Sequence, residues 1–120
     1  MSVRWYSVVV DCKNPSAQAR FWAEVLGYRI VFEEADEVAI ARDEDTYPTL
    51  VFVPVPESKT VKNRLHIDLA PDDRDAAVER LKHLGARPVD IGQGPDVTWV
   101  VLADPEGNEF CVLSARQSGL

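Results

Sequence analysis

Apolar and polar positions alternate along this chain in a pattern that occurs twice. A β-branched and aromatic run at 3–10 favours a buried strand, and Pro15 then opens an amphipathic stretch that ends at Leu26, just before Gly27. The large apolar side chains of that stretch recur at helical spacing, which predicts a helix with a left-handed glycine cap. Three short apolar runs separated by charged turns follow at 28–35, 38–41 and 50–53. The first half therefore predicts a strand, a helix and an antiparallel meander.

The same order of elements returns in the second half. A shift of 58 residues places Gly27 on Gly85 and Phe52 on Phe110. A strand is expected at 64–69, and a helix that starts near Asp73 should end before Gly85. The remaining predicted strands lie at 88–91, 97–103 and 109–114, the last two joined by a tight turn at 104–108. Two copies of one module, at about 1–57 and 62–116, account for nearly the whole chain.

Length and charge limit the classes of protein that the chain can represent. A chain of 120 residues with 46% hydrophobic content is expected to form a single domain at 1–120 with its own core. Its 13 basic and 20 acidic residues give a net charge of −7, which disfavours nucleic acid and anionic membrane surfaces as partners. The apolar runs are far shorter than the ~20 residues that span a bilayer.

The cysteines and the N-terminal residues suggest a compartment. Cys12 and Cys111 form no Cys-x-x-Cys metal pair, and the first residues lack the basic and then apolar pattern of a secretory signal. We therefore expect a cytoplasmic protein with reduced thiols.

Several motifs, in this order, carry a resemblance that covers the chain. They are Asp11-Cys12-x-x-Pro15, Ala19-Arg20-Phe21-Trp22, Leu26-Gly27-Tyr28, the segment 62–69, and Asp104-Pro105-Glu106-Gly107-Asn108-Glu109-Phe110. This set resembles the small glyoxalase-like branch of the glyoxalase/bleomycin-resistance family, the vicinal oxygen chelate superfamily. The resemblance implies an α+β fold of two tandem βαβββ modules, whose mixed sheet forms a cup with the helices outside. It also implies a small-molecule or divalent-metal site in that cup.

The superfamily includes lyases, ring-cleaving dioxygenases, epimerases, thiol transferases and proteins that only sequester a drug, so fold alone does not choose a function. In its metal-dependent members, four strand positions supply His, Gln or Glu ligands. The resemblance places these positions at Ser7, Val53, His66 and Cys111. One imidazole and one thiol fall short of the three or four ligands of a catalytic metal site, so we expect no metal and no other cofactor.

Other residues of the expected cup suggest acid–base chemistry. His66 and Asp68 lie two apart on an expected strand and so share one side, which the resemblance places inside the cup, and Asp11 is expected at the same mouth. A carboxylate beside an imidazole orients its tautomer, as a general base requires, although a purely structural pair is the alternative. Cys111 is either an activated nucleophile or an inert, buried thiol. Trp99 is a candidate wall of the pocket.

The sequence therefore predicts a metal-independent homodimer that binds a small organic molecule, with His66 and Asp68 as candidate catalytic residues. The other expected contacts to the ligand come from Ser7, Asp11, Val53, Trp99 and Cys111. Sequestration and mild acid–base chemistry both remain open as the activity. The alternative is a metal-dependent lyase or dioxygenase in which His66, Glu109 and a partner chain supply the ligands. A purely structural interaction module is disfavoured by the polar residues expected in the cup.

Overall fold

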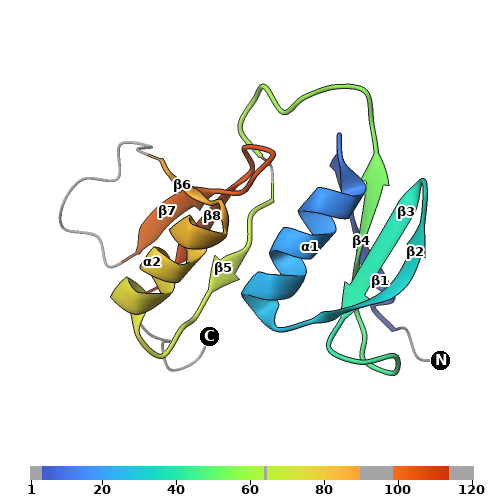
Figure 1. Cartoon of the computed structure of the whole chain (residues 1–120), viewed down its shortest axis with the longest axis horizontal. Coiled ribbons are helices and arrows are strands. Elements are labelled where there is room, and N and C mark those ends of the chain that lie inside the picture. The colour runs from blue at the N-terminus through green and yellow to red at the C-terminus, as the bar shows by residue number, and fades with distance from the viewer. Residues whose placement is uncertain (1–3, 64, 90–98, 114–120) are drawn as a thin grey trace. The chain divides into compact units, whose positions relative to one another are not determined.

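Each half of the chain folds into a four-stranded sheet with one helix against it (Figure 1). The structure is a computed structural model, and it describes residues 4–63, 65–89 and 99–113. The chain divides into two compact units, Met1–Lys59 and Thr60–Leu120, which correspond to the two predicted modules. The order of elements in each unit is strand, helix and three strands, so the predicted α+β fold of two βαβββ modules is confirmed.

The first unit combines parallel and antiparallel pairing in one sheet. Its elements are β1 (Ser7–Cys12), α1 (Pro15–Leu26), β2 (Arg29–Glu34), β3 (Glu37–Ala41) and β4 (Thr49–Pro54). The strand order is β1-β4-β3-β2. The last three strands form the predicted antiparallel meander, whereas β1 pairs in parallel with β4. A crossover through α1 makes this parallel pairing possible.

Local sequence signals set both ends of α1. The side chain of Asn14 caps the helix by accepting a hydrogen bond from the backbone N–H of Ala17 at 3.1 Å, and Pro15 occupies the first turn. Gly27 ends the helix in the left-handed region with φ 68°, as predicted. Phe21 and Trp22, at 6% and 3% exposure, then place the apolar face of the helix in the core of the unit.

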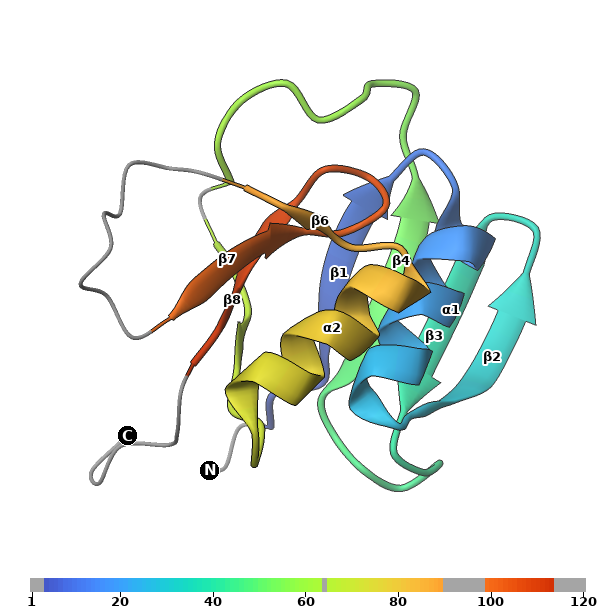
Figure 2. The same cartoon turned by 60° about the vertical axis from the view of Figure 1, so that its left-hand side comes forward.

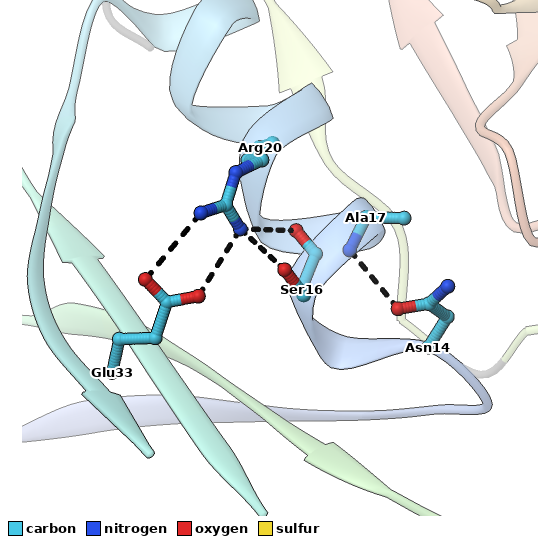
Figure 3. A network of polar contacts seen from close by, with 5 residues as sticks. All are labelled: Asn14, Ser16, Ala17, Arg20 and Glu33. Carbon is cyan, nitrogen blue, oxygen red and sulfur yellow. Dashed lines mark hydrogen bonds and ion pairs between the residues drawn. The ribbon is translucent and has the colours of Figure 1, made fainter. Parts of the chain in front are cut away.

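A polar network on the surface joins α1 to β2 (Figure 3). The Arg20 guanidinium donates to the Ser16 hydroxyl and carbonyl within the helix, and it pairs with the Glu33 carboxylate at 3.2 Å across to the strand. The Arg20 and Glu33 side chains are 54% and 41% exposed. A pair this exposed contributes about 0–1 kcal/mol, so apolar burial supplies most of the stability of this contact.

The second unit repeats this topology with shorter strands (Figure 2). Its elements are β5 (Asp68–Leu69), α2 (Arg74–Leu84), β6 (Arg87–Pro88), β7 (Val100–Ala103) and β8 (Glu109–Val112). The strand order is β5-β8-β7-β6, and β5 pairs in parallel with β8. Asp73 caps α2 as Asn14 caps α1, by accepting from the N–H of Ala76 at 3.1 Å. In the described part of the chain, no helix has the length and apolar character needed to cross a membrane.

The predicted tight turn between β7 and β8 is confirmed. The Gly107 N–H donates to the Asp104 carbonyl at 2.9 Å, and Gly107 takes a φ of 89°. The Asp104 side chain is 1% exposed and accepts from the backbone N–H groups of Glu106 and Asn108. These hydrogen bonds satisfy a buried carboxylate and fix the entry to β8.

Several predicted strand boundaries were wrong. For example, β6 spans Arg87–Pro88, so it ends before Val89, which was expected inside a strand at 88–91. The strand expected at 64–69 is only Asp68–Leu69, so His66 precedes it, because β5 pairs with just two residues of β8. The first strand, expected at 3–10, spans Ser7–Cys12, since its pairing with β4 extends to Pro54. β7 begins at Val100, so Trp99, expected inside a strand at 97–103, precedes it. The parts of the predicted strands that fall within 90–98 and 114–120 lie outside the described residues.

Candidate functional site

The sheet of the second unit has two different faces. Phe110 and Val112 of β8 are 1% and 0% exposed and lie on the face against α2. Side chains alternate along a strand, so Cys111 lies on the opposite face. Its partner in the parallel ladder is Asp68, which places both side chains on that face next to each other.

His66 completes a polar cluster with these two residues. Its Nε2 lies 3.0 Å from Asp68 Oδ1, and the two side chains are 50% and 51% exposed. One ligand atom each from His66, Asp68 and Cys111 lies within 4.8 Å of the other two. The structure therefore brings three of the predicted site residues together, and solvent reaches the imidazole and the carboxylate. We refer to these three residues as the His–Asp–Cys trio.

The surroundings of Cys111 favour its neutral thiol. Burial raises the pKa of the Cys111 thiol, and the charge of Asp68 raises it further, while Lys62 partly opposes this shift. A raised pKa keeps the thiol protonated at neutral pH and reduces its nucleophilicity. The other cysteine, Cys12, is 2% exposed, and its thiol donates to the Val53 carbonyl at 3.6 Å. It is a small core residue, as expected.

The residues expected to contact a ligand in the first unit also share one face. Asp11 pairs with Val53 in the ladder between β1 and β4, and Ser7 pairs with Thr49 at its other end. These residues lie on the face opposite α1, since Phe52, at 1% exposure, lies on the other one. Val9 lies between Ser7 and Asp11 on the same face and is 57% exposed. On this face of β1, the exposed Val9 therefore lies between two polar residues, Ser7 and Asp11.

The ladder register shows how the two units correspond. Asp11 pairs with Val53 as Asp68 pairs with Cys111, so Asp11 is the counterpart of Asp68. In this register the counterpart of His66 is Val9, an offset of 57 residues at the first strand of each unit, whereas Val53 and Cys111 differ by 58. A repeat that is recognised from its apolar runs alone does not reveal this difference of one residue between the two offsets.

The set of residues at the family's four ligand positions does not fit a shared metal ion. The resemblance assigns the positions in the first unit to Ser7 and Val53, and neither residue is an ordinary ligand of zinc, iron or nickel. Only His66 and Cys111, both in the second unit, carry donors that such metals prefer.

Glu109 and Trp99 lie outside the His–Asp–Cys trio. Glu109 shares the face of Cys111, but in the described residues the close group of possible ligands contains Asp68 in its place. The Glu109 carbonyl accepts from Asn63 Nδ2 at 2.9 Å. Trp99 directly precedes β7 and is 36% exposed. Sequence reasoning missed two interactions: the charge of Lys62 acts on Cys111, and Asn63 donates to the Glu109 carbonyl. The position of both residues just before His66 could have suggested them.

Comparison with known proteins identifies the relatives of this chain. A family profile described as the glyoxalase-like domain matches residues 7–113. No curated protein matches the chain in sequence.

Solved structures resemble the chain over nearly its whole length. One is a glyoxalase/bleomycin resistance protein/dioxygenase family enzyme from Burkholderia phytofirmans PsJN, with 19% identity, a TM-score of 0.68, and coverage of 92% of this chain and 97% of that one. Another is a bleomycin resistance determinant encoded on transposon Tn5, with 19% identity, a TM-score of 0.61, and coverage of 96% and 100%. A third is the bleomycin-binding protein of Streptomyces verticillus in complex with copper(II)-bleomycin, with 17% identity, a TM-score of 0.61, and coverage of 97% and 99%. At these identities the likeness shows the fold.

Proposed function

Because the chain belongs to the glyoxalase-like domain family, we propose that it binds a small organic molecule, without a metal ion shared by its two units. The observation that carries this proposal is the half-exposed pair of His66 and Asp68 on the sheet face opposite α2. The imidazole and the carboxylate provide a donor and an acceptor there. Similar folds include a protein that binds bleomycin, which supports a small molecule as the ligand.

The activity that we propose is sequestration or mild acid–base chemistry. Asp68 holds the His66 imidazole at 3.0 Å and fixes which ring nitrogen faces the ligand. An oriented imidazole that solvent can reach is able to exchange a proton with a bound molecule. Cys111 contributes its neutral thiol as a weak donor and as apolar surface.

The exposure of the His66 and Asp68 side chains argues against a purely structural role for the pair. A buried Asp68 would lose its partner on removal of His66 and would cost a few kcal/mol of stability. Since 51% of the Asp68 side chain is exposed, water can replace the imidazole at little cost. We therefore assign the pair to ligand recognition.

Binding to matched variants tests the proposal. A small-molecule library is screened by thermal shift against chelator-treated protein, and hits are measured by calorimetry. We expect His66→Ala and Asp68→Asn to weaken a hit at least tenfold, with melting temperatures close to that of the parent protein. His83→Ala, which removes the other histidine from an exposed position on α2, should change neither quantity.

Two results would contradict the proposal. The first is a large fall in melting temperature for His66→Ala with unchanged ligand affinity, which would make the pair structural. The second is a chelator-treated protein that yields no hit until a divalent metal ion is added. That result would favour the metal-dependent lyase or dioxygenase.

A further inference from the structure

The His–Asp–Cys trio combines three side-chain types that zinc prefers. Imidazole nitrogen, carboxylate oxygen and thiolate sulfur are common zinc ligands, and a thiolate favours zinc over magnesium or calcium. The three ligand atoms already lie within 4.8 Å of one another. Bound zinc lies about 2.0–2.3 Å from each ligand, so ligand atoms around it are about 3.5 Å apart. The Cys111 sulfur would have to approach the other two atoms, while the His66 and Asp68 atoms, now 3.0 Å apart, would separate slightly. Half-exposed side chains such as His66 and Asp68 can move by this amount.

The trio differs from the metal site that the family resemblance implies. That site takes ligands from both modules, and Asp68 is not one of its four positions. The trio lies wholly in the second unit. The counterparts of its members in the first unit are Val9, Asp11 and Val53, which offer a single carboxylate. At these positions, only the second unit therefore has a nitrogen ligand and a sulfur ligand together.

We propose that the His–Asp–Cys trio binds one zinc ion with three protein ligands, and that bound zinc excludes the organic ligand from His66 and Asp68. Binding forms a zinc–sulfur bond and releases the Cys111 thiol proton to solvent, while a water molecule completes a four-coordinate site. Two anionic ligands, Asp68 and the Cys111 thiolate, balance the charge of the ion. Lys62 is the positive group whose field acts on Cys111, and it favours the thiolate. The second half of this proposal rests on the proposed function, whereas the first half does not.

Metal titration of the full chain tests the site directly. Chelator-treated protein is titrated with zinc by calorimetry and with cobalt(II) by absorption. We expect one zinc ion per chain and a sulfur-to-cobalt charge-transfer band in the near ultraviolet. His66→Ala, Asp68→Asn and Cys111→Ser should each weaken zinc at least tenfold, and Cys111→Ser should abolish the band. Circular dichroism checks that each variant is folded.

Matched variants elsewhere in the chain provide the controls. His83→Ala and Cys12→Ala remove the other histidine and the other cysteine, and Asp11→Asn changes the counterpart of Asp68. None of these should alter the affinity for zinc. A folded Cys111→Ser protein that binds zinc as tightly as the parent, or a cobalt complex without the charge-transfer band, would overturn the zinc site.

Competition then tests the second half of the proposal. Zinc at saturation should weaken the binding of a hit from the small-molecule screen at least tenfold. Undiminished binding of that hit to the zinc-loaded protein would overturn the exclusion. The zinc titration needs no organic ligand. It therefore tests the metal site even if the proposed function fails.

Discussion

Asp68 connects the other two members of the His–Asp–Cys trio. Its carboxylate lies 3.0 Å from the His66 imidazole, and its place in the ladder opposite Cys111 brings its charge near the thiol. One carboxylate thus orients the imidazole, and it adds to the effect of burial, which is the larger cause of the raised pKa of the Cys111 thiol. In the first unit, the counterpart of Asp68 is Asp11. It lies opposite Val53, which carries no thiol, and the counterpart of His66 is Val9, which carries no imidazole.

The reactivity of Cys111 should reveal this influence. Burial and the Asp68 charge raise the pKa of the thiol, so its alkylation by iodoacetamide at pH 8 should be slower than that of an unstructured cysteine. Asp68→Asn removes the charge and lowers the pKa, which should increase the alkylation rate several-fold at that pH. Mass spectrometry identifies the modified residue and separates Cys111 from Cys12. An unchanged rate in Asp68→Asn would show that the carboxylate does not act on the thiol.

The raised pKa of the Cys111 thiol also determines the direction in which pH changes the stability of the protein. The unfolded state loses the Cys111 proton at a lower pH than the folded state does. The associated stabilisation is therefore complete below the unfolded pKa and is lost as the pH rises through the folded pKa. Zinc affinity should change in the opposite sense and increase with pH, because binding displaces the same proton.

At the scale of elements, both helices begin and end in the same way. A side-chain oxygen of Asn14 or Asp73 accepts from the backbone N–H three residues later, at 3.1 Å in each helix. A glycine with positive φ, Gly27 or Gly85, ends each helix. These devices act on the backbone within a few residues, so each copy of the module carries its own.

Removal of the first cap should destabilise the protein measurably. Asn14→Ala deletes the acceptor for the Ala17 N–H, and we expect a loss of about 1 kcal/mol in the free energy of unfolding. Asn14→Asp keeps an acceptor at the same place and should lose little. Urea denaturation followed by circular dichroism measures both. Equal stability of the alanine and aspartate variants would show that the hydrogen bond contributes nothing.

At the scale of the whole molecule, a cluster of exposed aromatic residues requires an explanation: the stacked Tyr6 and Tyr47, with Trp5 next to Tyr6 in the sequence. Trp5, Tyr6 and Tyr47 are 67%, 68% and 40% exposed, and Tyr6 stacks on Tyr47 with ring centroids 5.4 Å apart. The Arg4 guanidinium lies 5.1 Å from the centre of the Tyr47 ring. Trp, Tyr and Arg are the residues most enriched in protein interfaces. This composition supports association between copies of the chain.

We therefore predict a homodimer in solution. Light scattering at micromolar concentration should give about twice the chain mass of 13.4 kDa. Trp5→Glu introduces a charge into the cluster and should shift the protein toward the monomer, whereas the exposed Glu34→Gln should leave the mass unchanged. A monomeric parent protein would disprove the dimer. A dimeric Trp5→Glu variant would show that another surface forms the contact.

The sequence by itself determined the features that depend on neighbouring residues. The repeat, the helix Pro15–Leu26 with its caps, and the turn at 104–108 all follow from side chains within a few positions of one another. The pairing of His66 with Asp68 is equally local, since the two residues are separated by only one other. Motifs in a fixed order then identified the family before any strand pairing was known.

Only the tertiary structure decided what depends on pairing between distant segments. The length of β5 is set by how much of β8 lies beside it, so the alternating polar and apolar residues at 64–69 could not reveal that His66 precedes the strand. The register also decided that Asp68 lies opposite Cys111 and that Val9 is the counterpart of His66. The physical reason is that ladder hydrogen bonds join any two strands in several registers, while a shift of one residue turns every side chain to the other face.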